Sequence, residues 1–349
     1  MKHLLAGLLA TFAIAPFGIA HAELQEQNFR ALLHHTPVPQ SKDVEVPFWT
    51  ETIPQASGGK ITAAMTFTDQ AGLADADLLR YLKIGAFDFA SFDLSKMAGD
   101  DPRFEGCDIA GLTSDLESAR AVCDAYRPVL ARMLEEQWNA KLLAIGTAPP
   151  QAVWCRTEIN GLADLEGKKI RVFNRTMNDF VKAVGAIPIN ISFAEVVPAL
   201  QQGVVDCGVT GNAVGNAAGW TEVTSTILPL ALGWSINIHA VNLDAWNRLD
   251  AETQAFFEGQ FPVLEERFWT FFAEAVADAD NCNFGREPCR MGNPANMTLA
   301  PFSDEDRQRY AEILENVVIS GWAERVGPAA AAEWNDTVGK ALGLTAPTE

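Results

Sequence analysis

Arg171 is the residue whose type and setting point most clearly to chemistry. It stands in the run Lys168-Lys-Ile-Arg-Val172, where the apolar Ile170 and Val172 flank it as in an alternating β-strand. The two neighbours then face one side and Arg171 the other. If that other side borders a cleft, the planar guanidinium can bind a carboxylate through paired hydrogen bonds. A structural salt bridge, for example to Asp206, is the alternative that these residues leave open.

Motifs for catalysis are nearly absent from the sequence. It contains no G-x-S-x-G, H-E-x-x-H, phosphate-binding or dinucleotide-binding signature. Ser57 and Lys60 have the spacing of a serine–lysine nucleophile pair, but the S-D-N and K-T-G motifs that accompany such a pair are missing. We interpret Ser57-Gly-Gly-Lys60 as a turn and expect neither enzymatic activity nor a cofactor. The alternative is a secreted serine hydrolase that uses Ser57 and Lys60.

Metal ligands are equally scarce. Adjacent residues on a strand point to opposite faces, so His34 and His35 should not share an ion, and at most one should face a cleft. None of the six cysteines forms a C-x-x-C pair or has a histidine at zinc-ligand spacing. We therefore expect no metal site.

The six cysteines instead predict disulfides. Their number is even, and such bonds persist in exported proteins. Cys282 and Cys289 would close a short turn-rich loop and Cys107 and Cys123 a modest one, which leaves Cys155 to pair with Cys207. The alternative is a set of buried free thiols.

The N-terminus predicts export. Lys2 precedes an apolar run over 4–20, and Ala20-His21-Ala22 offers small residues at the positions that a signal peptidase reads. We expect residues 1–22 to be a signal peptide, cleaved near Ala22, and the mature chain to be periplasmic; the alternative is that this segment is a membrane anchor. No later stretch is long and apolar enough to span a membrane. The formal charge of −19 disfavours binding to nucleic acid.

The order of predicted elements indicates an α/β fold with two lobes. Strand and helix patterns alternate before Pro149-Pro150 and alternate again after it. A long helix, interrupted at Pro262, would be about 45 Å long and could cross both lobes. We expect strands at 28–33, 61–67, 87–92, 151–156, 169–173 and 204–207, and helices at 44–52, 74–82, 176–184, 193–202, 251–279 and 304–321.

Three stretches around Arg171 together resemble one family. They are Asp164-Leu-Glu-Gly-Lys-Lys-Ile-Arg-Val172, Gly185-Ala-Ile-Pro188 and Phe193-Ala-Glu-Val-Val-Pro-Ala-Leu-Gln-Gln-Gly-Val-Val-Asp206. In this order they resemble the TRAP-transporter periplasmic substrate-binding proteins, the DctP-like family. The resemblance implies a two-lobed periplasmic binding protein fold, with a sheet flanked by helices in each lobe and a long helix spanning both. Lobe 1 would comprise 23–148 and about 236–275, and lobe 2 would comprise 149–235 and about 276–349.

The resemblance also assigns the site residues. Arg171 matches the arginine that binds the ligand carboxylate in the family, and Phe193 matches an aromatic residue that packs on the ligand. Thr210 stands where many relatives have asparagine, and Gln151 where sialic-acid-type relatives have a second arginine. From lobe 1, the strand ends at His35, Phe92 and Asp93 should reach the cleft; we also assign Trp234 and Asn174 to it.

The expected ligand follows from this set. One guanidinium can neutralise one buried carboxylate, which favours a monocarboxylate. Trp154, Phe173, Phe193, Trp220 and Trp234 lie near strand ends and favour an aromatic or hydrophobic hydroxy- or keto-acid. A dicarboxylate or a sugar acid is the alternative ligand. The resemblance further implies that the lobes close on the ligand and that the closed form docks on a TRAP membrane permease, although a sensing role would use the same cleft.

Overall fold

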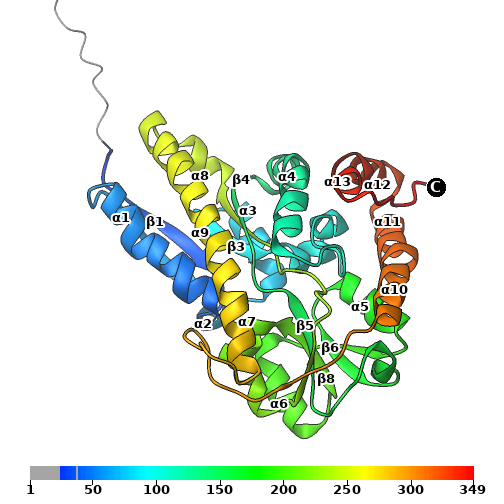
Figure 1. Ribbon diagram of the computed structural model, residues 1–349. Helices are drawn as coiled ribbons and strands as arrows, with labels where there is room; N and C mark the ends of the chain where they lie inside the picture. The colour runs from blue at the N-terminus through cyan, green and yellow to red at the C-terminus, as the bar shows by residue number, and fades with distance from the viewer. Residues whose placement is uncertain (1–23, 37) are drawn as a thin grey trace, which may run out of the picture.

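Two β-sheets organise the computed structural model, which describes residues 24–36 and 38–349 (Figure 1). The predicted signal peptide lies outside these residues. The first sheet has the strand order β2 (Ile61–Phe67), β1 (Gln27–Leu33), β3 (Phe89–Asp93), β10 (Asn237–Asn242), β4 (Ala140–Gly146). The second has the order β11 (Thr298–Leu299), β9 (Thr226–Leu228), β5 (Gln151–Cys155), β8 (Cys207–Gly211), β6 (Lys169–Val172), β7 (Ile187–Asn190).

Each sheet mixes parallel and antiparallel strands. In the first, β1 is parallel to β2 and β3, while β10 is antiparallel to β3 and β4. In the second, β6 is parallel to β7 and β8, while β5 is antiparallel to β8 and β9. β10 belongs to the first sheet although it follows most of the second in sequence, so the chain crosses between the sheets more than once.

Helices cover the faces of both sheets. Their bounds are α1 (Ile53–Ala56), α2 (Thr68–Ala71), α3 (Leu78–Lys83), α4 (Leu116–Trp138), α5 (Arg175–Ala183), α6 (Val196–Gln202), α7 (Asn212–Ala217), α8 (Leu243–Asn247), α9 (Ala251–Asn283), α10 (Asp304–Ile313), α11 (Ser320–Val326), α12 (Pro328–Trp334) and α13 (Lys340–Leu342). The predicted helix at 44–52 appears as two π-helical turns, Gln40–Glu45 and Phe48–Thr52. The C-terminal helices α10 to α13 stand together beside α4 and α5 (Figure 1).

α9 is continuous through Pro262, so the predicted interruption is wrong. A proline inside a helix costs about 3 kcal/mol. Burial of Phe257, Phe261 and Phe268 against the first sheet offsets this cost, since each buried phenylalanine contributes about 1.5–3 kcal/mol. The helix contacts β4 of the first sheet and α7 beside the second (Figure 1). The prediction of an α/β fold with two sheets and one helix spanning both is confirmed.

One strand begins later than predicted. The sequence predicts a strand at 204–207, but residues 204–206 form a turn, and β8 runs over Cys207–Gly211. Gly203 ends α6 in the left-handed region at φ 72°, and the backbone N–H of Val204 then donates to Ala199 O at 2.9 Å. The backbone of Val204 and Val205 is therefore taken up by the turn that ends the helix and cannot pair in the sheet, and Val204 is left half exposed.

All three predicted disulfides are present. Cys107 is bonded to Cys123, Cys155 to Cys207 and Cys282 to Cys289. Cys155 and Cys207 face each other in the register of β5 and β8, so this bond joins two central strands of the second sheet.

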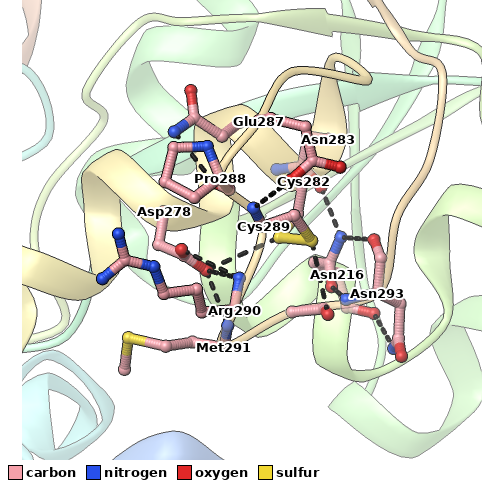
Figure 2. Close-up of a disulfide and its surroundings, with 12 residues drawn as sticks. Asn216, Asp278, Cys282, Asn283, Glu287, Pro288, Cys289, Arg290, Met291 and Asn293 are labelled. Carbon is pink, nitrogen blue, oxygen red and sulfur yellow. Dashed lines mark hydrogen bonds between the residues drawn. A yellow bond between two sulfur atoms is a disulfide. The ribbon is translucent and has the colours of Figure 1, made fainter.

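The Cys282–Cys289 loop fastens the end of α9 to α7 (Figure 2). The Asp278 carboxylate accepts hydrogen bonds from the backbone N–H groups of Arg290 and Met291, at 3.0 and 2.7 Å. The Asn216 side-chain amide donates to Asn283 Oδ1 and Asn293 O, both at 2.8 Å. Because Asn216 belongs to α7, the loop fixes the helix that follows β8.

A buried acid lies where the turn at Pro102–Glu105 meets α5. Glu105 Oε1 accepts hydrogen bonds from the backbone N–H and the hydroxyl of Thr176, at 3.2 and 3.3 Å. Oε2 is buried and has no hydrogen-bond partner among the described residues. Burial raises the pKa of Glu105 to about 7, because water no longer solvates its charged form.

We expect Glu105→Gln to stabilise the protein at alkaline pH. Because the folded chain holds the Glu105 proton up to a higher pH than the unfolded chain does, the free energy of unfolding falls as the pH rises from about 4.5 to about 7. Above pH 7 this loss of stability is complete and amounts to about 3 kcal/mol. Glutamine keeps the oxygen that Thr176 needs and carries no charge. Thermal unfolding should show a higher melting temperature for the variant at pH 8.5 and little difference at pH 5. A difference in melting temperature between the two proteins that is the same at pH 5 and at pH 8.5 would contradict the raised pKa of Glu105.

Candidate functional site

A cavity opens between the two sheets, beyond the carboxyl ends of β1, β3, β6 and β8. Its volume is about 570 Å³, counting the part that opens to solvent. The first sheet and the segments next to it contribute His34, His35, Val38, Gln40, Asp93, Lys96, Ser235 and Asn237, and the second sheet and its connections contribute Ala148, Gln151, Arg171, Phe173, Phe193, Thr210 and Val214. We call this the inter-sheet cavity.

Arg171 reaches the inter-sheet cavity from β6. Its neighbours Ile170 and Val172 pack into the main core, so alternation turns the guanidinium to the opposite face of the strand. There Nε–H donates to Ile191 O at 3.2 Å and Nη1–H donates to Val209 O at 2.9 Å. Two backbone carbonyls therefore hold the guanidinium in place while its charge stays available.

The charge of Arg171 has no ion-pair partner among the residues that the structure describes, although the nearby Asp75 attracts it. The alternative partner, Asp206, instead accepts a hydrogen bond from the backbone N–H of Lys169 at 2.9 Å. Only 3% of Arg171 is exposed, and this burial lowers its pKa to about 10. The group is still a cation at neutral pH, and a ligand carboxylate would offset its desolvation.

Two aromatic rings flank the guanidinium. Its central carbon lies 5.0 Å from the centre of the Phe173 ring and 5.9 Å from that of Phe193. Behind Phe193, the indole of Trp220 stacks on it at 5.9 Å. Phe173 and Phe193 line the inter-sheet cavity, whereas Trp220 is fully buried. The aromatic wall available to a ligand therefore consists of two phenylalanines rather than five aromatic residues.

Opposite Arg171, three charged or titratable side chains form a linked group on the side of the first sheet. Asp75 accepts a hydrogen bond from the Lys96 ammonium at 2.5 Å and lies 2.9 Å from His35 Nε2. Burial alone would raise the pKa of Asp75, but Lys96 and His35 hold it well below its ordinary value. No sequence pattern identified Lys96 as a residue that lines the cavity. Because Asp75 pairs with it, Lys96 adds no uncompensated charge.

A second, more open cavity adjoins the first. It has a volume of about 1120 Å³, counting the part that opens to solvent, and shares Lys96, Arg171, Phe173 and Phe193 with the inter-sheet cavity. Asn174 lines this second cavity, where its side chain also caps α5 by accepting a hydrogen bond from the Met177 backbone N–H at 2.8 Å.

The other predicted site residues divide into two groups. Gln151, Thr210, His35 and Asp93 line the inter-sheet cavity together with Arg171 and Phe193. Phe92 and Trp234 do not, and both are buried in the main core. Phe92 alternates with Asp93 along β3 and so points away from the cavity. The Trp234 indole N–H donates to the Thr113 hydroxyl at 2.9 Å, which turns the ring inward.

His34 and His35 both line the cavity, so the prediction that at most one would face it is wrong. β1 ends at Leu33, and the two histidines lie in the bend that follows, where strand alternation no longer applies. His34 and Gln40 are cavity residues that the sequence reasoning did not identify. The only signal for His34 was its position directly after a predicted strand, and no sequence signal pointed to Gln40.

Ser57 has a structural role in its turn. Its hydroxyl donates to Pro54 O at 3.3 Å and accepts from the Ile61 backbone N–H at 3.0 Å. Ser57 is buried and lies outside the inter-sheet cavity. Across residues 24–36 and 38–349, no cluster of three or more histidine, cysteine, aspartate or glutamate residues could hold a metal ion. Within the same ranges, no helix is both long and apolar enough to cross a membrane.

Comparison with known proteins relates the chain to bacterial solute-binding proteins. Residues 34–324 match the family described as bacterial extracellular solute-binding protein, family 7, or DctP. The sialic acid-binding periplasmic protein SiaP of Vibrio cholerae is 28% identical over 159 residues, which are 45% of this chain and 49% of that protein. The match thus spans about half the length of this curated relative.

Solved structures resemble the whole fold. DctP7 of Bordetella pertussis, an extracytoplasmic solute receptor that binds pyroglutamic acid, has a TM-score of 0.78 at 19% identity and covers 89% of this chain and 99% of its own. A TRAP periplasmic solute-binding protein of Desulfovibrio salexigens with bound orotic acid has a TM-score of 0.78 at 16% identity, covering 90% and 99%. The two-lobed architecture of these proteins is therefore the architecture of this chain.

Proposed function

Because the chain belongs to family 7 of the bacterial extracellular solute-binding proteins, we propose that it captures a small organic monocarboxylate in the inter-sheet cavity. The ligand would be an aromatic or other hydroxy- or keto-acid whose carboxylate binds Arg171. The lobes, with the limits given above, would close around it, and the closed form would deliver it to a TRAP membrane permease. In this proposal residues 1–22 are removed and the mature protein works in the periplasm.

The observation that carries the proposal is the setting of Arg171. A buried cation whose protein partners are two backbone carbonyls is costly unless another group neutralises it. A ligand carboxylate would form charge-assisted hydrogen bonds with it, each worth about 1.5–3 kcal/mol. Lobe closure would strengthen them by excluding water. Capture requires no catalytic group, so we propose that the protein is not an enzyme.

The charge balance of the cavity favours one carboxylate over two. Lys96 is the other cation that lines it with a fixed charge, and Asp75 already pairs with Lys96. A second acid group would have to displace Asp75 or remain unpaired. Gln151, which by the sequence resemblance would stand where some relatives have a second arginine, donates its amide N–H to Pro149 O at 2.9 Å. A dicarboxylate or a sugar acid is therefore the second choice.

We expect Asp75→Asn to shift the preference towards dicarboxylates. The substitution removes the partner of Lys96 and adds one uncompensated positive charge beside the cavity. The affinity for succinate relative to a monocarboxylate of similar size, such as butyrate, should rise about tenfold, which corresponds to 1.4 kcal/mol. Isothermal titration calorimetry on both proteins would measure the ratio. A ratio that does not change would show that Lys96 does not face the ligand.

A thermal-shift screen of carboxylic acids tests the function itself. A tight ligand raises the melting temperature, because it binds the folded chain and not the unfolded one. We expect shifts from monocarboxylates and smaller or no shifts from uncharged analogues such as the matching amides. A protein that no carboxylic acid stabilises would contradict the proposal. Turnover of a chromogenic ester that is lost in Ser57→Ala would instead support the hydrolase alternative.

A further inference from the structure

The second cavity is lined by a cation that the proposed function does not use. Arg175 is the first residue of α5, and its side chain is exposed and lines this cavity. It forms no ion pair with a carboxylate among the residues that the structure describes. Because arginine keeps its proton in proteins, this charge is present at every physiological pH.

Arg175 has a fixed position relative to Arg171. β6 ends at Val172 and α5 begins three residues later, so the two α-carbons are at most about 14 Å apart. The Asn174 side chain caps α5 by accepting from the Met177 backbone N–H at 2.8 Å. β6 belongs to the second sheet and α5 packs beside it (Figure 1), so a movement of the two lobes would leave this separation unchanged.

The place of Arg175 in α5 is unfavourable for a cation. The backbone N–H groups at the start of a helix carry a partial positive charge, which repels an arginine and favours a carboxylate. The first turn of α5 contains no acidic residue, and Glu105, which accepts from the Thr176 N–H, is buried behind this end of the helix. The fold therefore gains nothing from a positive charge at this position, and its use must lie in the cavity.

The charges that line the two adjoining cavities are mainly positive, in contrast to the chain as a whole. Counting lysine, arginine, aspartate and glutamate, three cations face two carboxylates there: Lys96, Arg171 and Arg175 against Asp75 and Asp93. The whole chain has a formal charge of −19, so most of its surface repels an arriving anion. Without Arg175, the cations and carboxylates that line the two cavities would balance.

We propose that the second cavity is the entrance to the inter-sheet cavity and that Arg175 attracts the carboxylate of an arriving ligand towards Arg171. This proposal rests on the proposed function and adds to it a residue that sets the rate of capture. Arg175 acts on the free ligand through solvent, so it speeds association and has little effect on dissociation. Salt should abolish the effect, because the Debye length falls from about 30 Å at 0.01 M to about 3 Å at 1 M.

Two substitutions of Arg175 give a graded test. At 0.01 M salt, Arg175→Gln should lower the association rate constant of a monocarboxylate about threefold, and Arg175→Glu, which reverses the charge, about tenfold. A threefold change is what one unit charge about 6–7 Å from the path of the ligand produces in water. Stopped-flow tryptophan fluorescence with the best acid from the thermal-shift screen would measure both rate constants. The dissociation rate constant should change less than twofold, and at 1 M salt the association rate constants should agree.

Lys182 provides the matched control on the same helix. It is exposed near the other end of α5 and lines neither cavity, so Lys182→Gln and Lys182→Glu should leave the association rate constant unchanged. The melting temperature gives a second comparison, because a cation is favourable only near the carboxyl end of a helix. Arg175→Gln should raise it by about 1–2 °C and Lys182→Gln should lower it by a similar amount. A fall for Arg175→Gln would contradict the argument that the fold gains nothing from this cation.

The kinetic outcomes separate this inference from the proposed function. Association rate constants that the Arg175 substitutions leave unchanged at 0.01 M salt, or lower equally at 1 M salt, would overturn the inference while the proposed function stands. Faster dissociation with unchanged association would place Arg175 in contact with the bound ligand and would also overturn it. If no carboxylic acid binds the unaltered protein, the proposed function fails and this inference fails with it.

Discussion

Arg171→Met should weaken the binding of a monocarboxylate ligand by a hundredfold or more without lowering the melting temperature of the ligand-free protein. Methionine fills a similar volume and removes the cation that the ligand carboxylate would neutralise. Loss of two charge-assisted hydrogen bonds at about 1.5–3 kcal/mol each exceeds the 2.7 kcal/mol that a hundredfold requires. Calorimetry with the best acid from the thermal-shift screen measures the loss.

A melting temperature that does not fall is unusual when a buried residue is replaced. Burial lowers the pKa of Arg171 to about 10 from its ordinary 12.5, so its charge costs about 3 kcal/mol of folding free energy at neutral pH. Replacing an uncompensated buried charge with an apolar side chain is often neutral or stabilising. Lys169→Met is the matched control, since Lys169 is exposed on the same strand and should leave affinity unchanged. A large drop in melting temperature for Arg171→Met would indicate a structural role instead.

Removing the Cys155–Cys207 disulfide should destabilise the protein more than removing either other bond. The two cysteines are 52 residues apart, and closing a loop of this length contributes about 4 kcal/mol on the chain-entropy account. Cys155→Ala/Cys207→Ala should lower the melting temperature by about 5–10 °C. Ligand affinity should change little, because backbone hydrogen bonds still hold β5 and β8 in register and so keep Gln151 and Thr210 in place.

The Cys282–Cys289 bond provides the comparison. It spans only 7 residues, for which the same account gives about 2.5 kcal/mol. The Asp278 and Asn216 hydrogen bonds also remain to hold the loop against α7. Cys282→Ala/Cys289→Ala should therefore lower the melting temperature by about half as much. A larger effect from the shorter loop would contradict the loop-length argument.

Much of the scaffold could be predicted because local rules apply to it. Period-two alternation located β1, β2 and β6, and it turned Arg171 away from Ile170 and Val172. Pairing by loop length gave all three disulfides. The errors arose where packing overrides a local signal: Pro262 should have interrupted a helix, but the aromatic residues that α9 buries keep it continuous.

The candidate site was harder to predict because tertiary structure assembles it. Arg171, Phe193, Thr210 and Gln151 follow a sequence pattern and line one cavity. Lys96 and His34 had no such pattern, and their side chains contact Asp75 and Glu45, which lie 21 and 11 residues away in sequence. Trp234 appeared suitable for stacking, but its hydrogen bond to Thr113 turns it into the core. The position of an aromatic residue near a strand end is therefore a weak indication that its ring contacts a ligand.

A crystal structure with the best-binding monocarboxylate tests the central claim most directly. The account predicts that both carboxylate oxygens lie about 2.7–2.9 Å from nitrogens of the Arg171 guanidinium, between Phe173 and Phe193. A carboxylate bound to Lys96 or elsewhere, with Arg171 touching only Ile191 O and Val209 O as it does here, would contradict the account.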